Sequence, residues 1–139
     1  MDNLRNMANS ASGTSVGPVE IPPSIKEKST AEDLRKRLDW GEPALTIIDV
    51  RDREDFNREH ILGAVAFPLD DLVPRAEDSL EKNRDIYIYG DSDAMTAQAA
   101  KQLRQAGFIN VAELVGGLAN WKAIGASIEG TATRSGPRP

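Results

Sequence analysis

A short loop with one serine and two aspartates follows one of the most apolar stretches of the chain. Residues 86–96 read IYIYGDSDAMT, a pattern typical of a buried strand, a glycine turn and the start of a helix. In proteins with parallel sheets, turns at the carboxyl ends of strands are the usual place for a site. The candidate loop consists of Gly90, Asp91, Ser92, Asp93, Ala94 and Met95, and Thr96 follows it.

Nucleophilic catalysis by the serine is the first chemistry to weigh. The run from Gly90 to Ala94 approaches the G-x-S-x-G elbow of serine hydrolases, which works with a histidine base placed late in the chain. The chain has a single histidine, His60, and it precedes Ser92. The hydrolase interpretation is therefore disfavoured.

Metal-assisted phosphoryl transfer is the second possibility. Asp91 and Asp93 have the D-x-D spacing of haloacid-dehalogenase-like phosphatases, in which one aspartate attacks the substrate beside Mg²⁺. Here Gly90 separates the strand from Asp91, and Thr96 stands one place too late for that motif. The plainer interpretation is structural: Asp91, Ser92 or Asp93 caps the helix, because side-chain oxygens accept its free N–H groups.

Strand and helix signals alternate along the rest of the chain. Apolar runs at residues 44–50, 64–68, 86–89 and 110–114 predict strands, and the stretches between them predict helices. A capping box of Ser29 and Glu32 is expected to start the first helix, which Gly41 and Pro43 end. This alternation predicts an α/β fold, a three-layer α/β/α sandwich around a mainly parallel sheet of about five strands.

Some positions within these elements can also be predicted. The buried side of the helix after the loop is expected to carry Ala97, Ala100 and Leu103, and Gly107 is expected to end that helix. An irregularity is expected at Pro74, in a helix that turns Leu72 and Val73 toward the core, and Trp121 is expected to pack on the sheet.

Composition excludes several classes of function. The 139 residues suit one domain, and Asp plus Glu outnumber Lys plus Arg by 22 to 17, which argues against nucleic acid as a partner. There is no cysteine, so thiol and persulfide chemistry by this chain is excluded. No segment has membrane-spanning length, so we expect no membrane insertion and a cytoplasmic location. Residues 1–24 and 131–139 are expected to be flexible tails around a domain at residues 25–130.

Two stretches of the chain resemble the rhodanese family. Residues 47–68, IIDVRDREDFNREHILGAVAFP, are similar to the signature D-V-R, then E-x-F/Y, then H-I-x-G-A-x-x-x-P. Residues 107–125, GFINVAELVGGLANWKAIG, are similar to the closing G-F-x-x-V-x-x-L-x-G-G-x-x-x-W. The likeness covers about residues 25–130 and is strongest to the cysteine-less, single-domain rhodanese-like proteins typical of cyanobacteria.

In active members, the resemblance implies a loop C-x-x-G-x-R after the fourth strand. Its cysteine carries a persulfide sulfur, and backbone N–H groups with the arginine hold the anion. Aligned on Thr96, Gly90 stands at the cysteine position, while Asp93 replaces the loop glycine and Met95 replaces the arginine. We interpret the loop as a vacated active site without a catalytic residue or metal, in which Asp93 fills the cradle as an internal anion. The two loop carboxylates would repel an incoming anion by several kcal/mol.

Three residues outside the loop have expected roles around it. Asp49 and Arg51 are predicted to join the loop after the first strand to the loop after Tyr89 through hydrogen bonds. His60 is predicted to be structural, hydrogen-bonded beneath the ends of the strands.

Three classes of function follow from this interpretation. The leading hypothesis is a catalytically inactive binding or regulatory module that contacts an unidentified protein partner through the rim of the loop. The second is a scaffold or sulfur relay that uses a partner's cysteine. The third is a small-ligand or cation binder at Asp91 and Asp93. We expect no cofactor and a monomeric protein.

Overall fold

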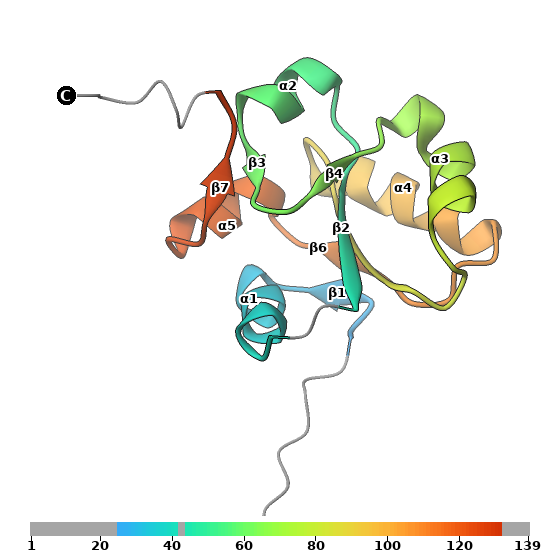
Figure 1. The fold of residues 1–139 in the computed structure, drawn as a ribbon, viewed down its shortest axis with the longest axis horizontal. Helices are drawn as coiled ribbons and strands as arrows, with labels where there is room; N and C mark the ends of the chain where they lie inside the picture. Colours follow the sequence, from blue (N-terminus) through green and yellow to red (C-terminus); the bar gives the residue numbers. More distant parts are fainter. Residues whose placement is uncertain (1–24, 42–43, 132–139) are drawn as a thin grey trace, which may run out of the picture.

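The computed structural model describes residues 25–41 and 44–131 (Figure 1). The expected tails, apart from Thr131, and the helix end predicted at Pro43 lie outside the described residues. The elements are β1 (Lys28–Ser29), α1 (Ala31–Asp39), β2 (Leu45–Asp49), α2 (Arg53–Arg58), β3 (His60–Ile61), β4 (Val65–Ala66), the 3₁₀ turn η1 (Leu69–Asp71), α3 (Leu72–Ser79), β5 (Asp85–Tyr89), α4 (Asp93–Gln105), β6 (Val111–Leu114), α5 (Gly117–Ala123) and β7 (Ile128–Glu129).

A five-stranded parallel sheet in the order β1-β6-β5-β2-β4 forms the middle layer. The central strands pair over their whole length, and Asp49 at the end of β2 lies opposite Tyr89 at the end of β5. The prediction of a mainly parallel sheet of about five strands is confirmed. β3 and β7 form a separate antiparallel pair that the sequence did not predict.

Two hydrophobic cores lie on opposite faces of this sheet, because successive side chains of a strand point to opposite sides. Ile86 and Ile88 of β5 pack with residues of α3 and α4. Tyr87 and Tyr89 pack on the other face with residues of α1 and α5, among them Trp121, which is buried as expected. The three layers are visible in Figure 1.

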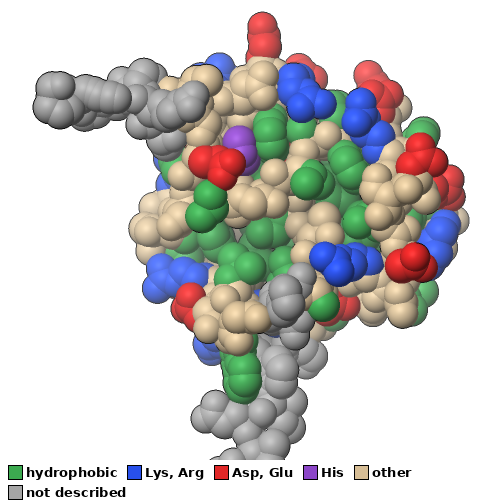
Figure 2. Space-filling model, viewed as in Figure 1, with side chains coloured by type: hydrophobic (Ala, Val, Ile, Leu, Met, Phe, Trp, Pro, Cys, Tyr) green, Lys and Arg blue, Asp and Glu red, His purple; other side chains and the backbone are tan. Residues whose placement is uncertain are grey.

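The edge of the sheet at β4 lies on the face that Figure 2 presents. Hydrophobic side chains gather in the middle of this face, over β3 and β4, and charged side chains lie mostly around its outline (Figure 2). Leu62, which follows β3, is 52% exposed. None of the helices in the described part of the chain has the length and apolar character needed to span a membrane.

Several local predictions were wrong or incomplete. The capping box at α1 is formed by Thr30 and Asp33, because Ser29 belongs to β1 and its hydroxyl donates to the Lys26 carbonyl. Ala97 is exposed, and Thr96 and Ala99 join Ala100 and Leu103 on the buried side of α4.

The remaining local predictions concern residues of α3 and the end of α4. Pro74 is the third residue of α3, where a helix has no internal partner for its N–H groups, so it causes no break. Leu72 is buried and Val73 is half-buried. Gly107, which follows the C-cap residue Ala106 of α4, has a φ of 102°, as predicted for a left-handed terminating residue.

Candidate functional site: a filled loop at the carboxyl ends of the strands

Ser92 is the residue that caps α4. Its hydroxyl oxygen accepts a hydrogen bond from the Met95 N–H at 3.1 Å, and its backbone is extended, as is usual at this position. The Thr96 hydroxyl closes the turn, since it accepts from the Gly90 N–H at 2.9 Å and donates to the Ser92 carbonyl at 3.0 Å. Of the three caps that the sequence left open, the hydroxyl of Ser92 is the one used.

The interior of the loop is filled by the side chain of Met95. The Asp91 N–H donates to the Met95 sulfur at 3.4 Å. A β-carbon placed on Gly90 would lie 3.0 Å from Cγ and Sδ of Met95 and 3.1 Å from Cγ2 of Val50. The expectation that Asp93 fills the cradle as an internal anion is therefore wrong. A neutral thioether lies where the nucleophile side chain of an active member would project.

Asp93 instead connects the loop to the start of α5. Its Oδ1 atom accepts a hydrogen bond from the Gly116 N–H at 2.9 Å. Gly116 has a φ of 77°, a left-handed conformation that favours glycine, and a β-carbon there would lie 1.9 Å from the side-chain nitrogen of Asn120. The turn between β6 and α5 thus has to be built from glycine, and it presents its N–H group to the loop.

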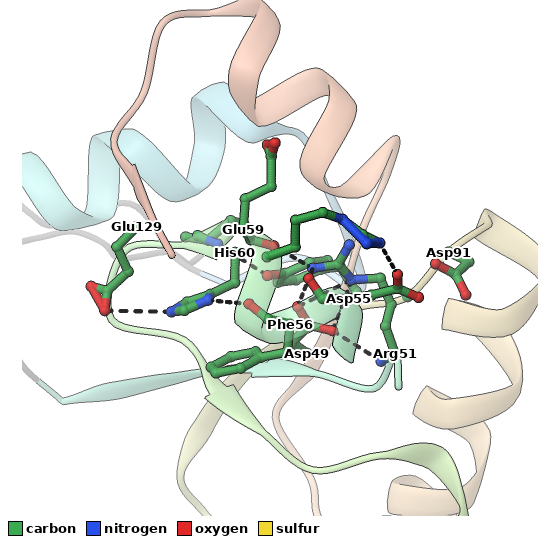
Figure 3. A network of polar contacts seen from close by, with 12 residues as sticks. Asp49, Arg51, Asp55, Phe56, Glu59, His60, Asp91 and Glu129 are labelled. Carbon is green, nitrogen blue, oxygen red and sulfur yellow. Dashed lines mark hydrogen bonds and ion pairs between the residues drawn. The ribbon is translucent and has the colours of Figure 1, made fainter. Parts of the chain in front are cut away.

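Arg51 lies beside the loop and is fixed by Asp49 (Figure 3). Its Nη2 is 2.8 Å from Oδ2 of Asp49 and its Nε is 3.1 Å from Oδ1, a two-pronged ion pair whose carboxylate is fully buried. Nη2 also donates to the Glu59 carbonyl at 2.7 Å. The pair therefore ties the end of β2 to the segment between α2 and β3, and not to the loop after Tyr89 as the sequence suggested.

Burial and neighbouring charges shift the pKa values of Arg51 and Tyr89 beside the loop. Burial alone lowers the pKa of Arg51, but the hydrogen bonds and charge of Asp49 outweigh it and hold that pKa above its ordinary value. The Tyr89 ring lies below this guanidinium, and its hydroxyl accepts from the Ile61 N–H at 3.1 Å. Burial, with the Asp49 charge, raises the pKa of the Tyr89 phenol. Both groups are fixed in one protonation state at neutral pH and serve as structural supports.

His60 is held by three contacts away from the loop (Figure 3). Its ring stacks on Phe56 with centroids 3.7 Å apart, and its Nδ1 lies 2.6 Å from the Phe56 carbonyl oxygen. Its Nε2 faces the Glu129 carboxylate of β7 at 3.4 Å. These contacts fasten β3 to α2 and β7. His60 does not line the pocket described next.

A pocket of about 260 Å³ opens between the loop and the start of α5. It is lined by residues 90–93 of the loop, by Arg51, and by Gly116, Gly117, Leu118 and Ala119. The sequence analysis named Asp91, Ser92, Asp93 and Arg51 around this loop, and it did not include the four lining residues that follow β6. The Gly116-Gly117 pair was the available signal, because it follows a parallel strand whose carboxyl end meets the same edge of the sheet.

The hydroxyl groups of the loop are used in its own hydrogen bonds. The Ser92 hydroxyl is engaged in the cap, and no histidine lies in the pocket lining to act as its base. Among residues 25–41 and 44–131, no group of three or more acidic or histidine side chains is placed to hold a metal ion. The pocket is thus bordered by a turn that its own hydrogen bonds close and by two exposed carboxylates.

Comparison with known proteins agrees with the geometry of this loop and sheet. Residues 30–124 match the family model described as the rhodanese-like domain. A solution structure of the rhodanese-like domain of the Alr3790 protein from Anabaena superimposes with a TM-score of 0.77 at 55% identity, covering 83% of this chain and 87% of that one. A crystal structure of the Alr3790 protein gives 0.72 at 61% identity, covering 73% and 91%.

Curated relatives place the same domain within longer proteins. A Bacillus subtilis protein, YrkF, named as a candidate sulfur carrier protein, is 36% identical over 98 residues, which are 70% of this chain and 51% of that protein. The rat centrosomal protein of 41 kDa is 32% identical over 111 residues, which are 74% of this chain and 32% of that protein. The chain thus spans about half or less of the length of these two relatives. With the motif, the fold and the family model in agreement, the chain belongs to the rhodanese-like domain family, as a member without cysteine.

Proposed function

We propose that this rhodanese-like domain is a non-catalytic protein-binding module whose contact surface is the rim of the vacated loop. We define the rim as residues 91–93 together with Gly116, Gly117, Leu118 and Ala119. The single observation that carries the proposal is the filling of the loop by Met95, which occupies the space of a nucleophile side chain and leaves a folded, open rim.

The rim is rigid in a way that suits recognition. Ser92 caps α4, and the Asp93 carboxylate bonds to the Gly116 N–H, so both sides of the pocket are fixed by hydrogen bonds. Surfaces fixed before binding lose less conformational entropy when a partner docks. The presence of this domain as one part of longer relatives is also typical of modules that act through other proteins.

A sulfur relay through a partner's cysteine has less support from the same geometry. A persulfide anion needs free N–H donors or a cation in the cradle. Here the Asp91 and Met95 N–H groups already bond to Met95 and Ser92 inside the loop. The sulfur-carrier name of YrkF belongs to a protein about twice as long as its matched region, and we do not extend it to this chain.

Comparative capture of partners from the native cell tests the proposal. Ala119→Arg places a long side chain in the pocket from an exposed position of α5, and Ala97→Arg makes the same change on an exposed position of α4 as a matched control. Arginine is well tolerated in helices, so both variants should fold. We expect proteins crosslinked by the wild type and by Ala97→Arg to be lost from Ala119→Arg. Equal capture by all three proteins would refute the rim as the contact surface.

A further inference from the structure

We propose that the pocket beside the loop receives a lysine or arginine side chain of the partner, so that the site has changed from an anion cradle to a cation acceptor. This inference rests on the proposed binding function and specifies the chemistry of the partner. Three features of the pocket lead to it: the use of its donors, its charge, and the shape and polarity of its walls.

Four of the N–H donors at the pocket are used internally. The N–H groups of Gly90, Asp91 and Met95 bond to side chains within the loop, and the Gly116 N–H bonds to the Asp93 carboxylate. An anion that approached these four groups would have to displace one of their bonds without a replacement, which is costly in a partly buried site. A ligand that brings its own donors meets no such obstacle.

The charge at the pocket is negative. Asp91 and Asp93 are both exposed, and no hydrogen bond or ion pair joins either carboxylate to a lysine or arginine among the described residues. Arg51 is the cation in the lining, and its charge is matched by the fully buried carboxylate of Asp49 at 2.8 Å. With that pair neutral as a unit, the two aspartates give the pocket an excess of two negative charges.

The size and walls of the pocket suit one long cationic side chain. Its volume of about 260 Å³ is below the roughly 300–1,000 Å³ typical of pockets for small molecules. Leu118 and Ala119 form an apolar wall at the start of α5, and Val115, 36% exposed, precedes it. Lysine and arginine bury an aliphatic stem along such a wall while the charged head reaches polar groups. A head placed between Asp91 and Asp93 forms charge-assisted hydrogen bonds there.

A peptide titration followed by amide NMR tests this inference on the full chain. The probes are acetyl-Gly-Gly-Arg-Gly-Gly-amide and the same peptide with norleucine in place of arginine. We expect saturable shifts of the amide signals of Asp91, Asp93, Gly116 and Ala119 with the arginine peptide, weakened by added salt, and no such shifts with the norleucine peptide or with thiosulfate. Asp91→Asn should weaken binding at least threefold. Asp78→Asn, which removes the same charge from an exposed position of α3, should change it little.

The outcomes separate this inference from the proposed function. Loss of captured partners from Ala119→Arg, combined with no shifts from the arginine peptide, keeps the binding module but overturns the cationic ligand. Equal weakening by Asp91→Asn and Asp78→Asn also overturns it, because the attraction would then reflect net charge alone. Shifts at the rim that respond equally to thiosulfate would show that the site still binds anions.

Discussion

Replacing Gly90 by alanine should destabilise the protein because Met95 occupies the space that the new methyl group needs. The β-carbon would lie 3.0 Å from Cγ and Sδ of Met95 and 3.1 Å from Cγ2 of Val50, closer than ordinary van der Waals contacts. Gly90 does not have a left-handed φ, so the alanine backbone itself is unstrained. The cost therefore arises from crowding.

The expected loss of stability in Gly90→Ala is the difference between two opposing effects. Overpacking of a buried site costs about 1–3 kcal/mol, while a glycine-to-alanine change at a compatible backbone gains about 0.4–1 kcal/mol through the unfolded state. The thioether is flexible and can move, but Val50 is 1% exposed and is held in the core. We expect a net loss of about 1–2 kcal/mol, and each kcal/mol should lower the Tm by a few degrees in a chain of 139 residues.

A double-mutant cycle isolates the contact with Met95. Gly90→Ala, Met95→Ala and the double variant are unfolded in urea, and the free energies of unfolding are compared. The double variant should lose at least about 1 kcal/mol less than the sum of the single losses, because removal of the thioether frees space for the methyl group. Additive losses, or a Gly90→Ala protein as stable as the wild type, would refute the filled loop.

Three further predictions concern the loop and the first helix. Gly90→Cys alone should transfer no sulfur from thiosulfate to cyanide. Detectable transfer should also require Asp93→Gly and Met95→Arg, because these changes restore the loop glycine and the cation. Equal activity of the single and triple variants would contradict this prediction. Ser92→Ala should cost about 0.5–2 kcal/mol as the loss of a helix cap, and urea unfolding should show a smaller loss for Asp93→Asn, which keeps the acceptor for Gly116. The N–H of Thr30 lowers the pKa of Asp33, so the stability that this carboxylate adds is present above its ordinary pKa of about 3.8 and is lost as the pH falls through its lowered value. Asp33→Asn should therefore reduce the loss of unfolding free energy on acidification. An unchanged dependence of stability on acidic pH would contradict the capping role.

Much of the fold could be predicted because its signals are local. Apolar β-branched runs such as residues 44–50 and 86–89 identify buried strands, and the helices between them impose a parallel sheet. The short strands β1, β3 and β7 could not be predicted, since two residues carry no periodicity and depend on pairing with distant partners. The cap of α1 was placed one residue too early because Ser29 and Thr30 fit the same pattern.

The site was predicted in its location but not in its contacts. The resemblance indicated a vacated active site at this loop, and charge alone suggested that Asp93 would fill it. Two facts decided otherwise: the Asp93 carboxylate reaches the N–H of a glycine 23 positions away, and the unbranched Met95 side chain folds back onto the turn. The first fact depends on how the turn after β6 lies beside α4. The second joins residues only four positions apart, but it depends on the rotamer that the flexible Met95 side chain adopts, for which the sequence has no signal.

The central claim is that the loop after β5 no longer performs sulfur chemistry, and a sulfurtransferase assay tests it most directly. Purified wild-type protein is incubated with thiosulfate and cyanide, and thiocyanate formation is followed against a buffer blank and a heat-unfolded sample. With no cysteine in the chain and Met95 inside the loop, we predict a rate equal to the blank. A rate above the blank that rises in proportion to folded protein and disappears on unfolding would contradict the account.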